Sequence, residues 1–300
     1  MPSAAVANRF LDPAVLAEVS SMELVAKTVV DGFVAGLHRS PDFGFSQEFA
    51  EYRAYTPGDD LRHIDWNVFA RTERAYLKRY RGETNTAVHV LLDVSASMGF
   101  GSGPVKKISY AKFLASAIVY LAHLQRDSAS LMVFHEELAN FVRPSARQGQ
   151  LMRLLHGIDQ AALGKRTNFQ KPLFELQLFL KRRGVNVLIS DFFDKPESII
   201  QTVQPLRFRG NEVILFHVLD QGEIEPSIGE AALLVDMESG ETLETSPDYA
   251  RSEYRAKIAA HIGELRAKAQ TAGLDYFLLR TDRPLDAALR EYFSVRQGRI

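Results

Sequence analysis

Apolar and polar residues follow one another along most of this chain in blocks whose lengths are typical of strands and helices. Short apolar runs recur from residue 87 onward, and they are continuous rather than alternating. Such runs indicate strands that are covered on both faces of a sheet. The predicted strands are residues 87–92, 131–134, 185–189, 213–219 and 276–279.

Helical periodicity fills the intervals between these runs. The predicted helices are residues 20–31, 104–125, 169–183 and 247–272. Pro104 follows a glycine and suits the first position of a helix, because its missing N–H would have no partner there. Gly32, Gly184 and Gly273 each follow a helical pattern and predict where the helices end.

Strands that alternate with helices predict a doubly wound, mostly parallel α/β sheet of the Rossmann-like kind. In the strand order 3-2-1-4-5-6, the first and fourth strands are neighbours at the point where the order reverses. We assign residues 87–92 to the first strand and residues 185–189 to the fourth. Ligands bind beyond the carboxyl ends of the strands at this point.

Residues 33–83 have a different character, with aromatic, arginine and acidic residues mixed in short segments. Pro57-Gly58 is a strong turn signal, and we expect two or three short strands here. The predicted domains are therefore an N-terminal helix and β-rich segment, residues 1–84, and an α/β domain, residues 85–300. The stretch from Pro57 to Trp66 is either a recognition surface or a turn held by Asp–Arg pairs with Trp66 buried. We favour the second interpretation.

Composition and charge narrow the function classes. The chain has 300 residues, 36 basic and 37 acidic side chains and a net charge of −1, so nucleic acid is not an expected partner. It has no cysteine, which excludes thiolate metal sites and cysteine nucleophiles. No apolar stretch reaches the roughly 20 residues that a membrane helix needs. We therefore expect a cytoplasmic protein without a membrane span.

Oxygen-bearing side chains follow the predicted first and fourth strands. Asp93, Ser95 and Ser97 come directly after the first strand, and Asp191 closes the fourth. Alternate residues of an extended loop share a side, so both hydroxyls can point where Asp93 points. Thr167 precedes the helix at 169–183 and is the fifth candidate. These five residues predict one metal site.

Carboxylates and hydroxyls are hard ligands that favour Mg²⁺, with Mn²⁺ or Ca²⁺ possible, over zinc or copper. Two carboxylates balance the charge of the cation and leave room for another ligand. A partner protein can supply that ligand as an Asp or Glu side chain. The alternative interpretation is a Mg²⁺-dependent phosphoester hydrolase, but no general base beside the five ligands is evident from the sequence.

The pattern resembles the metal-ion-dependent adhesion site of von Willebrand factor A-type domains. Residues 52–66, with the sequence YRAYTPGDDLRHIDW, and the downstream residues 77–80 resemble a bacterial family, domain of unknown function 58. The resemblance implies an A-type domain whose metal ligands match all five candidates. It also implies a MoxR-type AAA+ ATPase as partner. We therefore expect a metal-dependent protein–protein interaction module, an adaptor in chaperone-like assembly or maturation, and not an enzyme.

Overall fold

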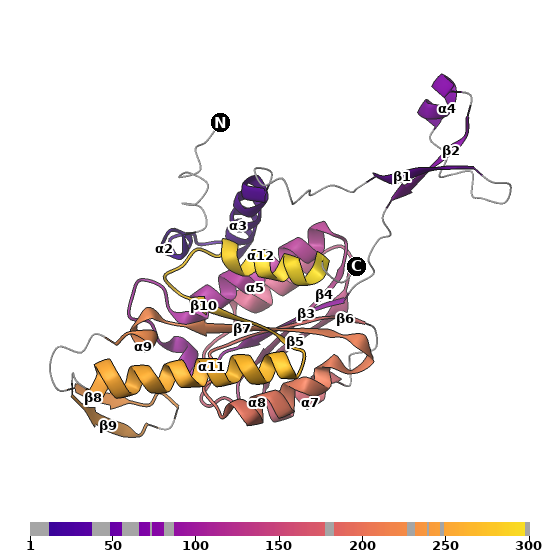
Figure 1. Cartoon of the computed structure of the whole chain (residues 1–300). Coiled ribbons are helices and arrows are strands. Elements are labelled where there is room, and N and C mark those ends of the chain that lie inside the picture. The colour runs from indigo at the N-terminus through magenta and orange to yellow at the C-terminus, as the bar shows by residue number, and fades with distance from the viewer. Residues whose placement is uncertain are drawn as a thin grey trace. The chain divides into compact units, whose positions relative to one another are not determined.

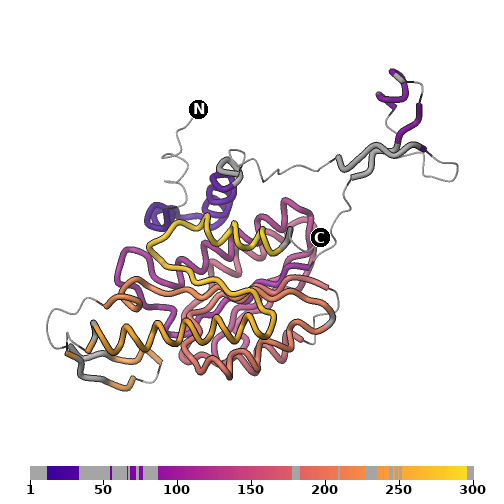
Figure 2. The backbone as a smooth tube through the Cα atoms, in the orientation of Figure 1, coloured from indigo at the N-terminus to yellow at the C-terminus, as the bar shows by residue number. Residues whose placement is uncertain are grey.

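The computed structural model describes residues 12–37, 49–55, 66–72, 74–80, 87–177, 183–226, 232–238, 240–246 and 249–297 (Figures 1 and 2). The chain divides into two compact units, residues 1–33 with 86–300, and residues 34–85. Our predicted division at residues 84 and 85 stays a prediction.

A six-stranded sheet forms the centre of the larger unit. Its strands are β3 (Ala87–Asp93), β4 (Ser128–Phe134), β5 (Leu138–Ser145), β6 (Gly184–Ser190), β7 (Glu212–Leu219) and β10 (Asp275–Arg280). Their order across the sheet is β10-β7-β6-β3-β4-β5, and all neighbours are parallel except β4 and β5. This is the order 3-2-1-4-5-6, so the predicted fold class is confirmed, with β3 and β6 side by side.

Two layers of helices cover the sheet (Figure 1). One face carries α5 (Lys107–Leu124), α6 (Gln150–Asp159) and α12 (Asp286–Gln297), and the other carries α7 (Gln170–Gln177), α8 (Pro196–Val203) and α11 (Arg255–Thr271). The other helical segments described are α2 (Pro13–Leu16), α3 (Met22–Leu37, of which residues 22–33 belong to the larger unit), η2 (Ala96–Gly99), η3 (Gln204–Gly210), α9 (Gln221–Ile224) and the π-helical η4 (Ala250–Tyr254). Every residue of β3 and β6 is buried, which explains their unbroken apolar runs.

Some predicted boundaries were wrong. α3 does not end at Gly32 but continues to Leu37, because one face of the helix is buried and Phe33 stacks on Phe293 of α12 at 5.2 Å between ring centroids. A glycine inside a helix costs only about 1 kcal/mol, which such packing outweighs. α5 begins at Lys107 rather than at Pro104.

The last long helix and the helix at 169–183 also differ from the predictions. α11 begins at Arg255, after the π-helical turn η4, and residue 247 lies outside the described residues. α7 covers Gln170–Gln177, and residues 178–182 lie outside the described part of the chain.

Three strands of the larger unit were not predicted. β5 is an antiparallel edge strand whose residues are partly or fully exposed, so it lacks a continuous apolar run. β8 (Ala232–Val235) and β9 (Thr242–Thr245) form an antiparallel hairpin outside the main sheet. The hairpin lies at the same end of the sheet as α9, which follows β7 (Figure 1).

The smaller unit contains an antiparallel hairpin of β1 (Phe49–Ala54) and β2 (Tyr76–Tyr80), with α4 (Trp66–Thr72) between the two strands in sequence. Trp66 is 60% exposed and meets Phe69 edge-on. Its expected burial against the larger domain stays a prediction. Residues 56–65 lie outside the described residues. Across the described residues, no helix is both long and apolar enough to cross a membrane.

Gly184 provides a test of the close approach of β6 and β3. A Cβ at Gly184 would lie against the backbone carbonyl of Ala87. We expect Gly184→Ala to lower the free energy of unfolding by about 1–3 kcal/mol, because backbone of a neighbouring strand cannot give way as a flexible side chain can. Denaturant unfolding followed by circular dichroism measures the change.

Gly263 on the exposed side of α11 is the matched control, because a Cβ there would meet nothing within 4 Å. Gly263→Ala should raise the free energy of unfolding by about 0.5–1 kcal/mol through helix propensity. Equal stability of Gly184→Ala and the wild type would contradict the close approach.

Candidate metal centre

Two buried carboxylates lie at the carboxyl ends of adjacent strands. Asp93 is the last residue of β3, Asp191 directly follows β6, and both are completely buried. The Ser190 hydroxyl donates a hydrogen bond to Asp93 Oδ2 at 2.6 Å. The pairing of β3 with β6 therefore brings together two carboxylates that are almost a hundred residues apart in sequence.

The loop after β3 supplies two hydroxyls beside Asp93. The Ser95 backbone N–H donates to Asp93 Oδ1 at 2.8 Å, which bends the chain over the carboxylate. The hydroxyl oxygens of Ser95 and Ser97 are 3.1 Å apart, so one donates to the other. Ser95 is buried and Ser97 is half-buried. The loop thus leads from the buried carboxylates to the surface.

Backbone hydrogen bonds join the loop after β3 to the loop that carries Thr167. Gly164 N–H donates to Val94 O at 2.6 Å, and Ala96 N–H donates to Lys165 O at 2.9 Å. A Cβ at Gly164 would overlap the side chain of His135, which follows β4, so a larger residue would have to displace that side chain or shift the loop. Half-buried Thr167 is therefore held at the same edge of the site as Ser97.

Glu238, in the turn between β8 and β9, contacts both of the outer hydroxyls. Its Oε1 accepts hydrogen bonds from Ser97 Oγ at 3.1 Å and from Thr167 Oγ1 at 2.7 Å. Its Oε2 accepts from the Thr167 backbone N–H at 3.1 Å. The structure therefore links Ser97 and Thr167 through a third residue that the sequence did not indicate.

Lys107, the first residue of α5, is completely buried beside the two aspartates. Its ammonium group donates to Asp191 Oδ2 at 2.8 Å and to Glu223 Oε1 at 2.5 Å. The ammonium also lies over the Phe193 ring, 4.7 Å from the centroid. Glu223 is held in turn, because its Oε2 accepts from the Asp220 backbone N–H at 2.8 Å.

The backbone at the end of β6 is strained. Phe192 has φ 49°, a left-handed conformation that is rare for a bulky residue. Its N–H donates to Ser190 Oγ at 3.0 Å, and its ring is buried and stacked on Phe169. Such strain costs roughly 1–3 kcal/mol and persists where the surroundings fix it. Here it turns the chain directly after Asp191.

Burial of the charged side chains shifts the pKa values of Asp93 and Lys107. Burial, and then the charge of Asp191, raises the pKa of Asp93 to about 7, although hydrogen bonds from Ser190 and Ser95 oppose the rise. Burial lowers the pKa of Lys107, but the carboxylates of Asp191 and Glu223 outweigh it and hold that pKa above its ordinary value. In the buried part of the site, the three carboxylates of Asp93, Asp191 and Glu223 and the Lys107 ammonium leave a net charge of −2 when all are ionised.

The predicted ligands fit a divalent cation on two observations. Asp191 Oδ1 is buried without a hydrogen-bond partner in the described structure, although Lys107 binds Oδ2 of the same carboxylate. The net charge of −2 also matches a divalent cation, and the hydroxyls of Ser95, Ser97 and Thr167 are hard donors. Across the described residues, no three His, Cys, Asp or Glu side chains form a metal-binding group, so the hydroxyls are essential to this fit.

The site residues that sequence reasoning missed are Ser190, Lys107, Glu223 and Glu238. A signal existed for Lys107, because a lysine in the first turn of a helix opposes the helix dipole and indicates a nearby anion. Our helix start at Pro104 hid this signal. Nothing in the sequence indicated Glu238, because its role depends on where an unpredicted hairpin docks.

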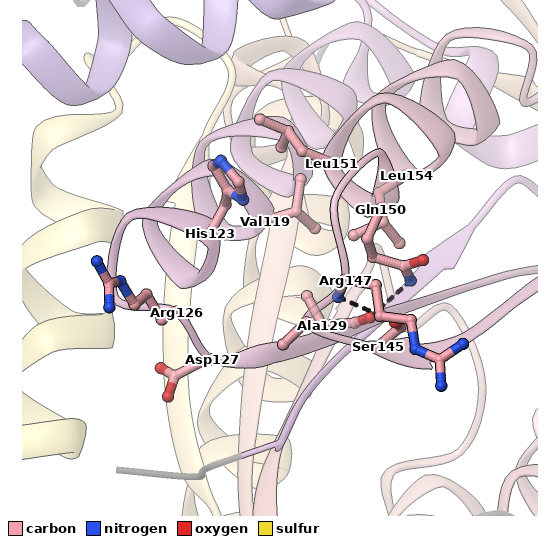
Figure 3. A pocket seen from close by; sticks show the side chains of 11 residues that line it. Val119, His123, Arg126, Asp127, Ala129, Ser145, Arg147, Gln150, Leu151 and Leu154 are labelled. Carbon is pink, nitrogen blue, oxygen red and sulfur yellow. Dashed lines mark hydrogen bonds between the residues drawn. The ribbon is translucent and has the colours of Figure 1, made fainter. Parts of the chain in front are cut away.

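A cavity of about 280 Å³ lies at the opposite end of the sheet, between α5, α6 and the start of β4 (Figure 3). The Gln150 side-chain amide donates to the backbone oxygens of Ala129 and Arg143 at its edge. Ala129 is near the amino end of β4, whereas Asp93 and Asp191 are at carboxyl ends. The cavity is therefore not part of the candidate metal centre.

The fold and the site define a doubly wound α/β protein with two buried carboxylates and neighbouring hydroxyls at the strand ends. The family model described as "Protein of unknown function DUF58" matches residues 51–264, and the chain belongs to this family. An uncharacterised protein of Mycobacterium tuberculosis is 30% identical over 295 residues, which cover 95% of this chain and 91% of that protein.

Solved structures with a similar fold include the VWA domain of SpRpn10, with 14% identity, a TM-score of 0.39, and coverage of 68% of this chain and 93% of that domain. They also include an aerotolerance-related membrane protein from Bacteroides fragilis, with 14% identity, a TM-score of 0.48, and coverage of 69% of this chain and 97% of that structure. The second structure is described as coming from a membrane protein. We do not retain the predicted cytoplasmic location.

Lys107 is predicted to compensate the buried carboxylates. The variant Lys107→Met removes the ammonium group and leaves Asp191 and Glu223 without a counter-charge. We therefore expect the free energy of unfolding to fall by about 3 kcal/mol. Added Mg²⁺ should restore part of this loss, because it provides Asp191 with a positive neighbour again. Thermal and denaturant unfolding with and without Mg²⁺ measure both effects.

The matched control is Lys171→Met, which removes a lysine from the exposed ion pair with Glu137. Exposed ion pairs contribute little to stability, so this variant should unfold like the wild type and respond to Mg²⁺ as the wild type does. If Lys107→Met were as stable as Lys171→Met, the compensating role of Lys107 would be wrong.

Proposed function

We propose that this protein is a metal-dependent protein–protein interaction module that binds an acidic side chain of its partner. Asp93, Ser95, Ser97, Thr167 and Asp191 would hold the cation, which is Mg²⁺ or, less readily, Mn²⁺ or Ca²⁺. When bound, the cation supplies a positive charge that attracts a carboxylate.

The observation that carries the proposal is the pair of buried aspartates with an unpartnered oxygen on Asp191. Asp93 and Asp191 repel each other in a buried position, and Lys107 compensates only part of their charge together with that of Glu223. The hydroxyls of Ser97 and Thr167 continue the site to the surface, where a partner can reach it. A site that is buried at one end and open at the other suits capture of a protein side chain.

We further propose that the site does not catalyse a reaction. Hydrolysis needs a general base that can reach a water molecule. Glu223, a carboxylate near the aspartates, is tied to Lys107 and to the Asp220 backbone. His217 is buried, its pKa is lowered to about 3 by that burial, and its Nδ1 lies 2.6 Å from the Tyr276 hydroxyl. Neither group is arranged as a base.

For the partner we propose a MoxR-type AAA+ ATPase, with the module acting as its adaptor in chaperone-like assembly or maturation. The support for this partner is the membership of the DUF58 family together with the resemblance described above. The physical requirement is only that the ATPase, or the protein delivered to it, presents an accessible carboxylate.

Asp93→Asn tests the metal centre, because it keeps the shape of the side chain and removes its charge. We expect Mg²⁺ affinity, measured by titration calorimetry, to fall by about ten- to a hundredfold. Capture of the MoxR-type ATPase of the source organism should fall with it, and chelator should abolish capture by the wild type. Ser97→Ala should weaken Mg²⁺ binding to a smaller extent.

Asp159→Asn is the matched control, because Asp159 ends α6 and lies outside the metal centre. It should leave Mg²⁺ binding and capture unchanged. Equal Mg²⁺ binding by Asp93→Asn and Asp159→Asn would contradict the metal centre, and capture that persists in chelator would contradict a metal-dependent interface.

A further inference from the structure

The turn between β8 and β9 is shaped to present Glu238 to the candidate metal centre. Asp236 Oδ1 accepts a hydrogen bond from the Glu238 backbone N–H at 2.8 Å, and Asp236 O accepts from Gly240 N–H at 2.9 Å. Gly240 has φ 75°, which a residue with a Cβ adopts only with strain. The turn is therefore ordered by its own hydrogen bonds and holds Glu238 at its tip.

Three donors of the site bind the Glu238 carboxylate. These are the hydroxyls of Ser97 and Thr167 and the backbone N–H of Thr167, at 3.1, 2.7 and 3.1 Å. Hydrogen bonds to an ionised carboxylate are about twice as strong as those between neutral groups. A carboxylate from another part of the chain is thus bound at the outer edge of the site, where a partner's carboxylate is proposed to bind.

An apolar contact accompanies the carboxylate. Met237 precedes Glu238, and its Cε lies 3.5 Å from the position that a Cβ on Gly99 would take. Leu163, which is 45% exposed, lies against the same side of Gly99. The hairpin therefore contacts the site through two adjacent residues, the apolar Met237 and the acidic Glu238.

Charge complementarity favours the same arrangement. Residues 232–245 contain four acidic residues, Asp236, Glu238, Glu241 and Glu244, and no lysine or arginine. The loop that carries Thr167 has Lys165 and Arg166, both exposed. The acidic hairpin therefore lies next to a basic loop of the site.

We propose that the β8–β9 hairpin is an internal ligand of the metal centre, and that Glu238 occupies the position of the partner's carboxylate until the partner displaces it. This inference rests on the proposed function. It also gives the chemistry of the partner segment: an acidic side chain next to an apolar one, presented on a turn, as Met237 and Glu238 are.

The hairpin competes well because it is tethered. A segment attached to the same chain acts at an effective concentration in the millimolar range. If the hairpin occupies the site about nine-tenths of the time, the apparent affinity for a free carboxylate falls about tenfold. Removing the Glu238 carboxylate should raise the apparent affinity for a free carboxylate about tenfold.

A labelled synthetic peptide with the sequence of residues 235–241 is the probe, and its binding in Mg²⁺ is measured by fluorescence anisotropy. We expect Glu238→Ala to bind the peptide about tenfold more tightly than the wild type does. The same peptide with glutamine in place of its central glutamate should not bind, and chelator should remove the difference between the two proteins.

Glu241→Ala is the matched control, because it removes the same charge from the same hairpin at an exposed residue outside the metal centre. It should bind the peptide as the wild type does. A tenfold gain in Glu241→Ala as well would show a general charge effect and would overturn the role of Glu238.

Mg²⁺ calorimetry on the same proteins separates the two proposals. If Mg²⁺ binding depends on Asp93 but Glu238→Ala and the wild type bind the peptide equally, the internal ligand is wrong and the proposed function stands. If Mg²⁺ does not bind in an Asp93-dependent way, both proposals fail.

Discussion

The structure depends on compensating the negative charge of two carboxylates that the sheet buries side by side. Parallel pairing of β3 and β6 places Asp93 and Asp191 at one edge, where water is excluded and like charges repel. Lys107, Glu223, Ser190 and the loop after β3 are arranged around this pair, and each contact stabilises a charge or orients an oxygen. Because one oxygen of Asp191 remains without a partner, the compensation within the described residues is incomplete. The proposed cation completes it.

The outer part of the site has a different character from the buried part. Ser97 and Thr167 are half-buried, come from loops joined by backbone hydrogen bonds, and face a hairpin outside the main sheet. In the proposed function, the buried carboxylates would define the position of the ion, whereas the hydroxyls and Glu238 would define the side from which a carboxylate approaches. This division would allow the partner to be exchanged without disturbing the core of the domain.

The sequence predicted the sheet well because burial on both faces leaves an unmistakable pattern. Continuous apolar runs identified β3, β6 and β7, and alternation with helices predicted their order. β5 was not predicted because an exposed edge strand has no such run. β8 and β9 are only four residues long each and lie outside the main sheet. Asp93, Ser95, Ser97 and Asp191 were chosen as candidate ligands because they follow strands, and Thr167 because it precedes a helix. Lys107 was missed because the helix that it begins was predicted to start at Pro104. Glu223 and Glu238 were missed because tertiary packing, rather than their neighbours in the sequence, brings them to the site.

The central claim is that oxygens from three separate segments hold one cation at the ends of β3 and β6. Anomalous diffraction from crystals grown with Mn²⁺ measures this directly. The account predicts a single strong peak within coordinating reach of Asp93, Thr167 and Asp191, which is absent from crystals of Asp93→Asn. A wild-type structure without a peak at this edge, or with the peak at another place, would contradict it.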